Sequence, residues 1–362
     1  MSEPLEEAEN PARISSRKEA HVRIVVEEDV TFRTKTTGLE SFELEVNAVP
    51  EIDADDVDCS VPFLSHRLRL PLMVTGMTGG YADAVRINGA LARACNAFGV
   101  AMGLGSQRQA LRSTEHHESF VVARREAPDV PLLANMGAVE VAGPDGPGLA
   151  ERIVDLVHAD ALAIHLNALQ ELLQPEGSPS FRGVLAGIES CVRLLPVPVV
   201  VKEVGAGISA SVARRLLDVG VRHIDIAGAG GTSWAGVELS RAGTPHLEHL
   251  WDAGIPTARC VEEVCAMKSD ATDFTCIASG GISSGFDVAK VLALGADIAG
   301  AARPFLLALE TGGEESLHRL FAQWKQQLLA SMFIAGAIDV VSLRSVALRD
   351  RTGTVVRPRR GP

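Results

Sequence analysis

Short apolar runs recur along the chain, and each ends in glycine or in a polar residue. Segments with apolar residues at helical spacing separate most of them, as at 82–98, 183–195, 210–219 and 285–294. This alternation is typical of repeated β-α-β units. The eight runs are Leu70–Gly76, Gly99–Ser106, Pro131–Gly137, Ala161–Asn167, Pro198–Gly205, His223–Gly228, Cys276–Gly281 and Ile298–Arg303.

Eight such units favour an α/β fold of the (β/α)8 TIM-barrel type. A doubly wound open sheet is the alternative, but no G-x-G-x-x-G motif follows the first run. The long spacing between the sixth and seventh runs predicts an insertion, roughly 229–258, over the carboxyl-terminal mouth of the barrel. We expect a disordered acidic N-terminus (1–16), one barrel domain (17–349) that includes an N-terminal extension bordering the mouth, and a flexible basic tail (350–362).

The bulk properties narrow the class of protein. A net charge of −12 over 362 residues argues against nonspecific nucleic-acid binding, so an anionic ligand would need a local basic cluster. No apolar run is long enough for a membrane span, and the acidic N-terminus is unlike a signal peptide. The six cysteines include no C-x-x-C pair and are expected to be reduced. We therefore expect a cytoplasmic protein that binds a small molecule.

The fourth run turns polar only at its end. With a period of two, Ala161, Ala163, His165 and Asn167 share one strand face, and Gln170 and Glu171 follow directly. Polar groups that converge where a parallel strand stops are typical of an active site in this class of fold. His165 is expected to donate a hydrogen bond to substrate.

Other strand ends suggest a bound cofactor. Glycine and alanine at 279–282 and 300–302 leave backbone N–H groups open to a phosphate, where many barrels bind one. Lys202 ends the fifth run and needs an anionic partner, such as an electron-rich cofactor, since period two points Glu203 to the opposite face. Short polar side chains on four strands suit the edge of a planar heterocycle; these are Thr78, Ser106, Asn135 and Thr232.

A basic cluster is expected from Arg17, Lys18, His21 and Arg108. Near such an anion site the single carboxylate Glu171 suits Mg²⁺, which binds through one or two carboxylates together with substrate phosphates. Alone, Glu171 could equally be a first-turn carboxylate that stabilises a helix.

Taken in order, these motifs resemble those of the type 2 isopentenyl-diphosphate isomerases, which are FMN-dependent (β/α)8 enzymes. The resemblance runs from Arg17 to about residue 345. Its motifs are Arg17–His21, Met77–Gly80, Gly105–Arg108, His165–Glu171, Val201–Gly205, Gly230–Trp234 and Ser279–Ile282.

The resemblance implies a role for each matching residue. Arg17, Lys18, His21, Ser106 and Arg108 would bind the substrate diphosphate. His165, Asn167 and Gln170 would line the substrate pocket, with catalytic roles for these three and for Lys202, and Glu171 would hold Mg²⁺. Glu238, in the insertion, would also face the site. FMN would be held by Met77, Thr78, Gly79, Ser106, Asn135, Lys202, Thr232, Gly280, Gly281, Ala301 and Ala302.

The implied reaction is the allylic shift that interconverts isopentenyl and dimethylallyl diphosphate, with reduced FMN, Mg²⁺ and NAD(P)H as the reductant. The chain departs from the family pattern at Ala253, where tryptophan is frequent, and at Ser283, where arginine is common. Two alternatives stay open: an FMN-dependent 2-hydroxy-acid oxidase, with His165 as base and Arg108 holding a carboxylate, and a non-catalytic flavin-binding barrel. A homo-oligomer, tetramer or octamer, is expected.

Overall fold

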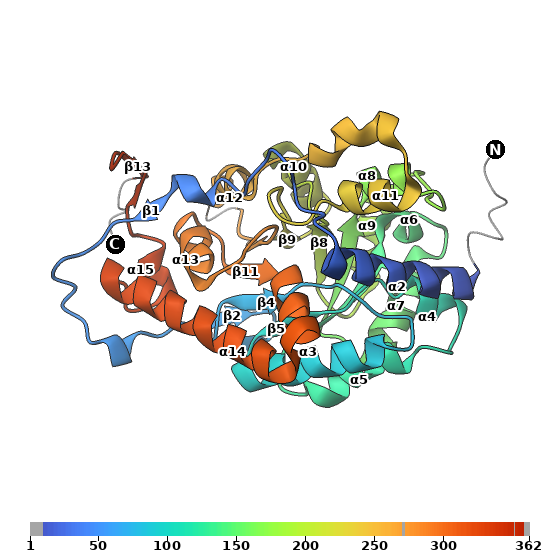
Figure 1. The fold of residues 1–362 in the computed structure, drawn as a ribbon, viewed down its shortest axis with the longest axis horizontal. Coiled ribbons are helices and arrows are strands. Elements are labelled where there is room, and N and C mark those ends of the chain that lie inside the picture. Colours follow the sequence, from blue (N-terminus) through green and yellow to red (C-terminus); the bar gives the residue numbers. More distant parts are fainter. Residues whose placement is uncertain (1–9, 270–271, 351, 358–362) are drawn as a thin grey trace.

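Eight parallel strands close into a barrel in the computed structural model, which describes residues 10–269, 272–350 and 352–357 (Figure 1). The strands follow one another around the barrel in chain order, and β11 pairs with β4 to close it. Each predicted run supplies one strand, so the predicted TIM barrel is confirmed. The strands are β4 (Leu72–Val74), β5 (Ala101–Gly103), β6 (Leu132–Gly137), β7 (Ala161–Leu166), β8 (Val199–Glu203), β9 (His223–Asp225), β10 (Thr275–Ala278) and β11 (Ile298–Ala301).

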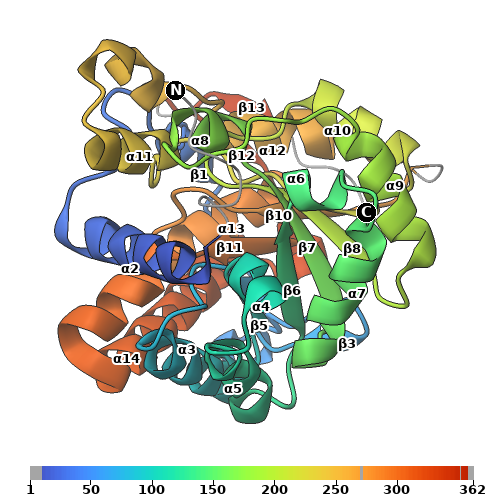
Figure 2. The ribbon, with the colours of Figure 1, turned by 90° about the vertical axis from the view of Figure 1, so that its right-hand side faces the viewer.

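Helices surround the barrel and bury the outer faces of the strands (Figure 2). The strands are therefore covered on both sides, which explains why they read as continuous apolar runs rather than as alternating patterns. The barrel helices are α3 (Ala84–Phe98), α4 (Arg108–Arg112), α5 (Glu118–Glu126), α6 (Ala138–Val141), α7 (Gly146–Val157), α8 (Ala168–Leu173), α9 (Val184–Leu194), α10 (Ala210–Asp218), α12 (Thr257–Cys265), α13 (Gly285–Ala293) and α14 (Arg303–Ala335).

Local sequence signals set several helix boundaries. The side chain of Ser209 accepts from the backbone N–H of Val212 at the start of α10, and Ser284 caps α13 in the same way. Gly99 ends α3 with a left-handed φ of 65°, which glycine adopts without strain. The helices predicted over 82–98, 183–195, 210–219 and 285–294 form within two residues of those limits.

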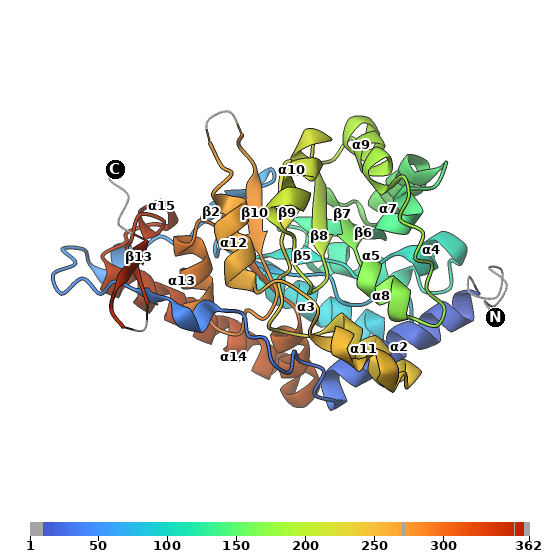
Figure 3. The same cartoon turned by 90° about the horizontal axis from the view of Figure 1, so that it is seen from above.

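Two segments outside the repeat border the mouth. The insertion after β9 forms α11 (Trp234–Ala242) and the 3₁₀ helix η3 (Pro245–Asp252), as predicted. The N-terminal extension forms α2 (Pro11–Glu27), which lies beside α11 in Figures 1 and 3. Residues 30–32, which follow α2, are hydrogen-bonded to the start of the insertion. The Phe32 N–H donates to the Gly231 carbonyl oxygen, and the Ser233 N–H donates to the Val30 carbonyl oxygen.

Smaller elements lie outside the closed barrel. The hairpin β2 (Val61–Phe63) and β3 (His66–Leu68) reaches the start of β9 through the ring contact of Phe63 with His223. A separate sheet has the order β1 (Glu43–Leu44), β12 (Leu348–Arg349) and β13 (Val355–Arg357). The remaining short elements are η1 (Leu39–Ser41), η2 (Ala54–Asp56) and α15 (Val340–Leu343).

Two expected boundaries are wrong in part. Helix α2 begins at Pro11, so residues 11–16 are ordered, because Asn10 caps the helix and its apolar side packs inward at Ile14. Strand β13 pairs with β12 inside the expected flexible tail. Residues 1–9 and 358–362 lie outside the described residues. Within the described ranges, no helix combines the length and apolar character that a membrane span requires.

Candidate functional site

A cavity of about 450 Å³ opens at the carboxyl-terminal mouth of the barrel, in the size range of small-molecule sites. All eight strand ends contribute to its wall, together with α2 and the start of the insertion. Most predicted site residues line it: Arg17, Lys18, His21, Met77, Ser106, Arg108, Asn135, His165, Asn167, Gln170, Glu171, Lys202, Thr232, Gly280, Gly281, Ala301 and Ala302.

Thr78 and Gly79 do not line the cavity. The Thr78 hydroxyl is buried and donates to the Tyr81 hydroxyl at 3.1 Å. Gly79 lies against the Phe120 ring, where an added Cβ would come within 2.1 Å of a ring carbon. Their place beside Met77 in the sequence suggested a direct contact, but the tight turn after β4 points them into the protein.

The predicted basic cluster forms where α2 meets the ends of β4 and β5. Lys18 Nζ donates to the carbonyl oxygen of Gly79 at 2.8 Å and to that of Ser106. Burial, with the positive charges of Arg17 and Arg108, lowers the pKa of Lys18 to about 7. Three cations this close repel one another, so the cluster favours a multiply charged anion.

Arg108 has a carboxylate neighbour that the sequence did not suggest. Its Nε lies 3.2 Å from Glu140 Oε1, and both residues line the cavity. Glu140 belongs to α6, which directly follows β6. It orients the guanidinium while leaving the net charge of the cluster positive.

His165 is held in a defined tautomer. Its Nδ1 lies 2.7 Å from Asn135 Oδ1, and Asn135 Nδ2 donates to the Leu104 carbonyl oxygen, which fixes the orientation of the amide. Nδ1 therefore carries the proton. Burial, with Lys202, Lys18 and Arg108, lowers the pKa of His165 to about 3. The neutral ring leaves Nε2 as a hydrogen-bond acceptor, so a donating role of His165 toward substrate would require the protonated ring.

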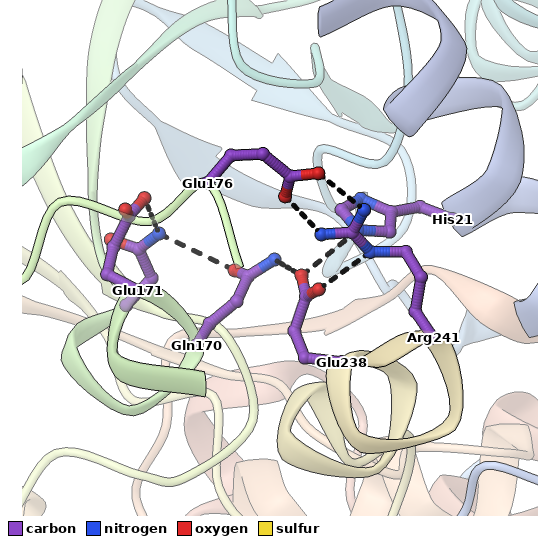
Figure 4. Close-up of polar contacts among 7 residues, drawn as sticks. His21, Gln170, Glu171, Glu176, Glu238 and Arg241 are labelled. Carbon is purple, nitrogen blue, oxygen red and sulfur yellow. Dashed lines mark hydrogen bonds and ion pairs between the residues drawn. The ribbon is translucent and has the colours of Figure 1, made fainter. Parts of the chain in front are cut away.

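Gln170 connects the cavity to a buried carboxylate. Gln170 Nε2 donates to Glu238 Oε1 at 2.9 Å, and His21 Nε2 lies 3.0 Å from the same oxygen (Figure 4). Glu238 is fully buried and is not part of the cavity wall, so it lies one layer behind Gln170 and His21. The hydrogen bonds and charge of His21 and the Gln170 hydrogen bond outweigh burial and lower the pKa of Glu238.

Asn167 and Glu171 form an oxygen-rich corner. Asn167 Nδ2 donates to Glu171 Oε1 at 3.0 Å, and the Ser178 N–H donates to Glu171 Oε2 at 2.7 Å. Asn167 Oδ1 is buried and has no hydrogen-bond partner among the residues that the structure describes. No group of three or more histidine, cysteine, aspartate or glutamate side chains suited to a metal occurs in the described part of the chain. An unsatisfied amide oxygen beside a carboxylate fits a Mg²⁺ that takes its other ligands from phosphate and water.

Lys202 faces the cavity without a carboxylate hydrogen bond. Its Nζ donates to the Glu203 carbonyl oxygen at 2.7 Å, while the Glu203 carboxylate accepts from the N–H groups of Val204 to Gly207. This confirms that the two side chains do not form an ion pair. Asp225, next to Lys202 in the sheet register, is fully buried and accepts from Ser279 Oγ at 2.6 Å.

The ends of β10 and β11 present little more than backbone to the cavity. Gly280, Gly281, Ala301 and Ala302 line it, and α13 and α14 begin just beyond them. A phosphate there would meet backbone N–H groups and the positive ends of two helices. Ser283, where the family commonly has arginine, donates to Asp287 through its N–H and its hydroxyl.

Several site residues escaped sequence reasoning. Glu140, Gln174, Glu176, Asp225 and Arg241 contact or line the site. Most of them lie away from the carboxyl-terminal strand ends on which the site prediction was based. Arg241 could have been found, because it stands three residues after Glu238 on one helix face.

Comparison with known proteins agrees with this geometry. Residues 166–350 match the family model of FMN-dependent dehydrogenases. The isopentenyl-diphosphate delta-isomerase of Chlorobium phaeovibrioides is 44% identical over 342 residues, which cover 91% of this chain and 96% of that protein. The isopentenyl-diphosphate delta-isomerase of Nostoc sp. PCC 7120 is also 44% identical, covering 92% of this chain and 95% of its own.

Solved structures with the same fold are more distant in sequence. A mandelate oxidase bound to (S)-mandelic acid superposes with a TM-score of 0.65 at 20% identity, covering 96% of this chain and 98% of that one. The same oxidase with (S)-2-phenylpropionate gives 0.65 at 19% identity. At this identity the likeness establishes the fold alone.

Proposed function

The chain belongs to the isopentenyl-diphosphate delta-isomerase family, and we propose that it interconverts isopentenyl and dimethylallyl diphosphate with the residues of its barrel mouth. The observation that carries this proposal is one cavity that joins a three-cation cluster to Gln170, which donates to the buried carboxylate of Glu238 behind the wall. The cations suit a diphosphate, and the pair suits a proton transfer.

The reaction adds a proton to one alkene carbon and removes one two carbons away, so it involves no net oxidation. Positive charge develops on a carbon of the hydrocarbon chain, and that chain offers the enzyme few polar atoms to bind. Binding energy must therefore come from the diphosphate. Arg17, Lys18 and Arg108 supply it, together with Ser106 on the same wall.

The proton is handled at the Gln170 end. An amide has no titratable proton near neutral pH, but the Glu238 carboxylate, whose Oε1 lies 2.9 Å from Gln170 Nε2, is ionised and can accept one. Gln170 orients the alkene and separates the Glu238 carboxylate from the carbocation-like carbon. His21 shares the same oxygen and keeps the pair in contact with α2.

FMN fits the remaining wall. Lys202, with only 8% of its surface exposed, has no carboxylate within hydrogen-bond distance in the described part of the chain and would hold the anionic edge of the ring, while the ends of β10 and β11 would hold the phosphate. When bound and reduced, FMN supplies electron density to a neighbouring cationic centre and a ring nitrogen that exchanges protons. Met77, Asn135 and Thr232 would contact the cofactor from the strands between.

Mg²⁺ and the reductant complete the proposal. Glu171, with the unsatisfied Asn167 Oδ1, would hold Mg²⁺ against the substrate diphosphate. NAD(P)H would reduce the flavin, since the isomerisation has no net redox change and cannot itself supply the electrons. We also propose action in the cytoplasm as a homo-oligomer. Exposed aliphatic side chains support association; they are Val46, Val49, Ile334, Ile338 and Val341.

The 2-hydroxy-acid oxidase alternative is poorly served by the same geometry. It needs His165 as a base, but a pKa of about 3 makes that ring a weak base near neutral pH. It also leaves the Gln170–Glu238 pair without use.

The test is product formation from isopentenyl diphosphate under anaerobic conditions, with FMN and Mg²⁺, with and without NADPH. Dimethylallyl diphosphate should form only when the flavin is reduced. No product with fully reduced flavin and Mg²⁺ would refute the isomerase proposal. Oxidation of a 2-hydroxy acid with reduction of the flavin would support the alternative.

A further inference from the structure

Glu238 divides its two carboxylate oxygens between two sets of partners. Oε1 meets Gln170 Nε2 at 2.9 Å and His21 Nε2 at 3.0 Å, on the side of the cavity. Oε2 accepts from Arg241 Nε at 3.1 Å, one turn along α11. Oε1 therefore contacts residues that line the cavity, whereas Oε2 is hydrogen-bonded to Arg241.

Arg241 is itself fixed by a second carboxylate. Its Nη1 and Nη2 donate to Glu176 Oε1 and Oε2 at 3.0 and 2.5 Å, a two-pronged pairing that restricts the guanidinium to one orientation (Figure 4). Glu176 lies just after α8, the helix that carries Gln170 and Glu171. One side chain thus joins the insertion to the segment that bears the proposed substrate residues.

We propose that Arg241 is a positioning residue for this reaction: it aligns Glu238 for Gln170 and keeps a fixed positive charge beside the carboxylate. The inference rests on the proposed function, because it assigns the Glu238 carboxylate a part in the proton transfer. Arginine suits the role, since it keeps its charge at every pH at which the protein is folded and presents three nitrogens in one plane.

The charged groups around Glu238 determine how a substitution of Arg241 changes the pKa of Glu238. Helix α2 contributes Arg17 and His21, and the segment after α8 contributes Glu176. Gln170 donates to Glu238 Oε1, as does Gln174 once its amide is oriented to satisfy both ends, at 3.2 Å. The charge of Arg241 is among the causes that lower the pKa of Glu238, so its loss raises that pKa.

The experiment compares Arg241→Gln with Glu176→Gln in the FMN-loaded enzyme, through the pH dependence of kcat. For Arg241→Gln we expect the limb governed by Glu238 to move to higher pH by half a unit or more, and kcat to fall about tenfold while KM changes little. Glu176→Gln removes a negative charge, so the same limb should move to lower pH. Opposite shifts separate a charge effect from a loss of structure, which would act alike in both variants.

Two further variants complete the comparison. Arg241→Lys keeps the charge but cannot pair with both carboxylates, so its limb should stay near the wild-type position while kcat falls. Arg259→Gln breaks an exposed ion pair with Glu263 on α12 and should match wild type. Unmoved limbs in both Arg241→Gln and Glu176→Gln, or shifts in the same direction, would overturn the inference. A wild-type enzyme without isomerase activity would instead refute the proposed function.

Discussion

The pKa of Lys18 makes substrate affinity depend on pH. Burial beside Arg17 and Arg108 lowers this pKa to about 7, so the free enzyme loses the Lys18 charge as pH rises through neutrality. A bound diphosphate favours the charged form and raises the pKa again. Above pH 7, binding must therefore recruit a proton, and the apparent Kd should rise about tenfold between pH 6 and pH 8.

Calorimetric titration of the FMN-loaded enzyme with dimethylallyl diphosphate measures both parts of this prediction. The apparent Kd is recorded between pH 6 and pH 9, and proton uptake is obtained from buffers that differ in ionisation enthalpy. Uptake should approach about one proton at pH 8, because most free Lys18 is then neutral. A Lys18→Gln variant provides the control, since it retains the ligand's own titration.

The two enzymes should converge at high pH. Lys18→Gln should bind more weakly than wild type at pH 6, with a flatter dependence on pH, and the difference should largely vanish by pH 9. If the difference in ligand affinity between wild type and Lys18→Gln stays constant from pH 6 to pH 9, Lys18 is charged over that whole range. That result would refute the argument from burial and neighbouring charge.

Four further predictions concern single side chains. Lys202→Met should weaken FMN binding at least tenfold, measured by flavin fluorescence, and unchanged affinity would contradict its cofactor role. Glu171→Gln should raise the Mg²⁺ concentration for half-maximal activity, and an unaltered Mg²⁺ titration would remove it from the metal site. Gln170→Asn should lower kcat, and undiminished turnover at saturating substrate would count against its role. Phe321→Ala, in the stacked and buried Phe305–Phe321 pair within α14, should cost about 3–5 kcal/mol of unfolding free energy by denaturant titration, and less than 1 kcal/mol would contradict this packing.

The barrel could be predicted because its signal is local and repeated. Each strand is a short apolar run ended by a glycine or a polar residue, and a parallel strand buried on both sides must have that composition. Parallel strands also place their carboxyl ends at one edge, so polar residues at those ends, such as His165, Asn167 and Lys202, could be expected to converge. The structure places all three on the cavity wall.

Roles that depend on side-chain direction could not be predicted in the same way. Thr78 and Gly79 stand in a motif with Met77, yet the turn points them away from the cavity. His165 was expected to donate to substrate, but its Nδ1–H donates to the Asn135 amide oxygen, whose orientation is fixed by the Leu104 carbonyl oxygen. Thr78 bonds to Tyr81, Gly79 packs against Phe120 of α5, and His165 bonds to Asn135 of the neighbouring strand, and strand periodicity carries no information about these contacts.

The sequence by itself determined the fold, the edge of the barrel that carries the site and most of the residues that line it. Only the tertiary structure decided which charged groups meet across segments: Glu140 with Arg108, Glu176 with Arg241, and His21 with Glu238. The reason is physical. Burial and strand direction follow from the order of residues within one segment. The pKa values and hydrogen-bond roles follow instead from distances between segments that lie far apart in the chain.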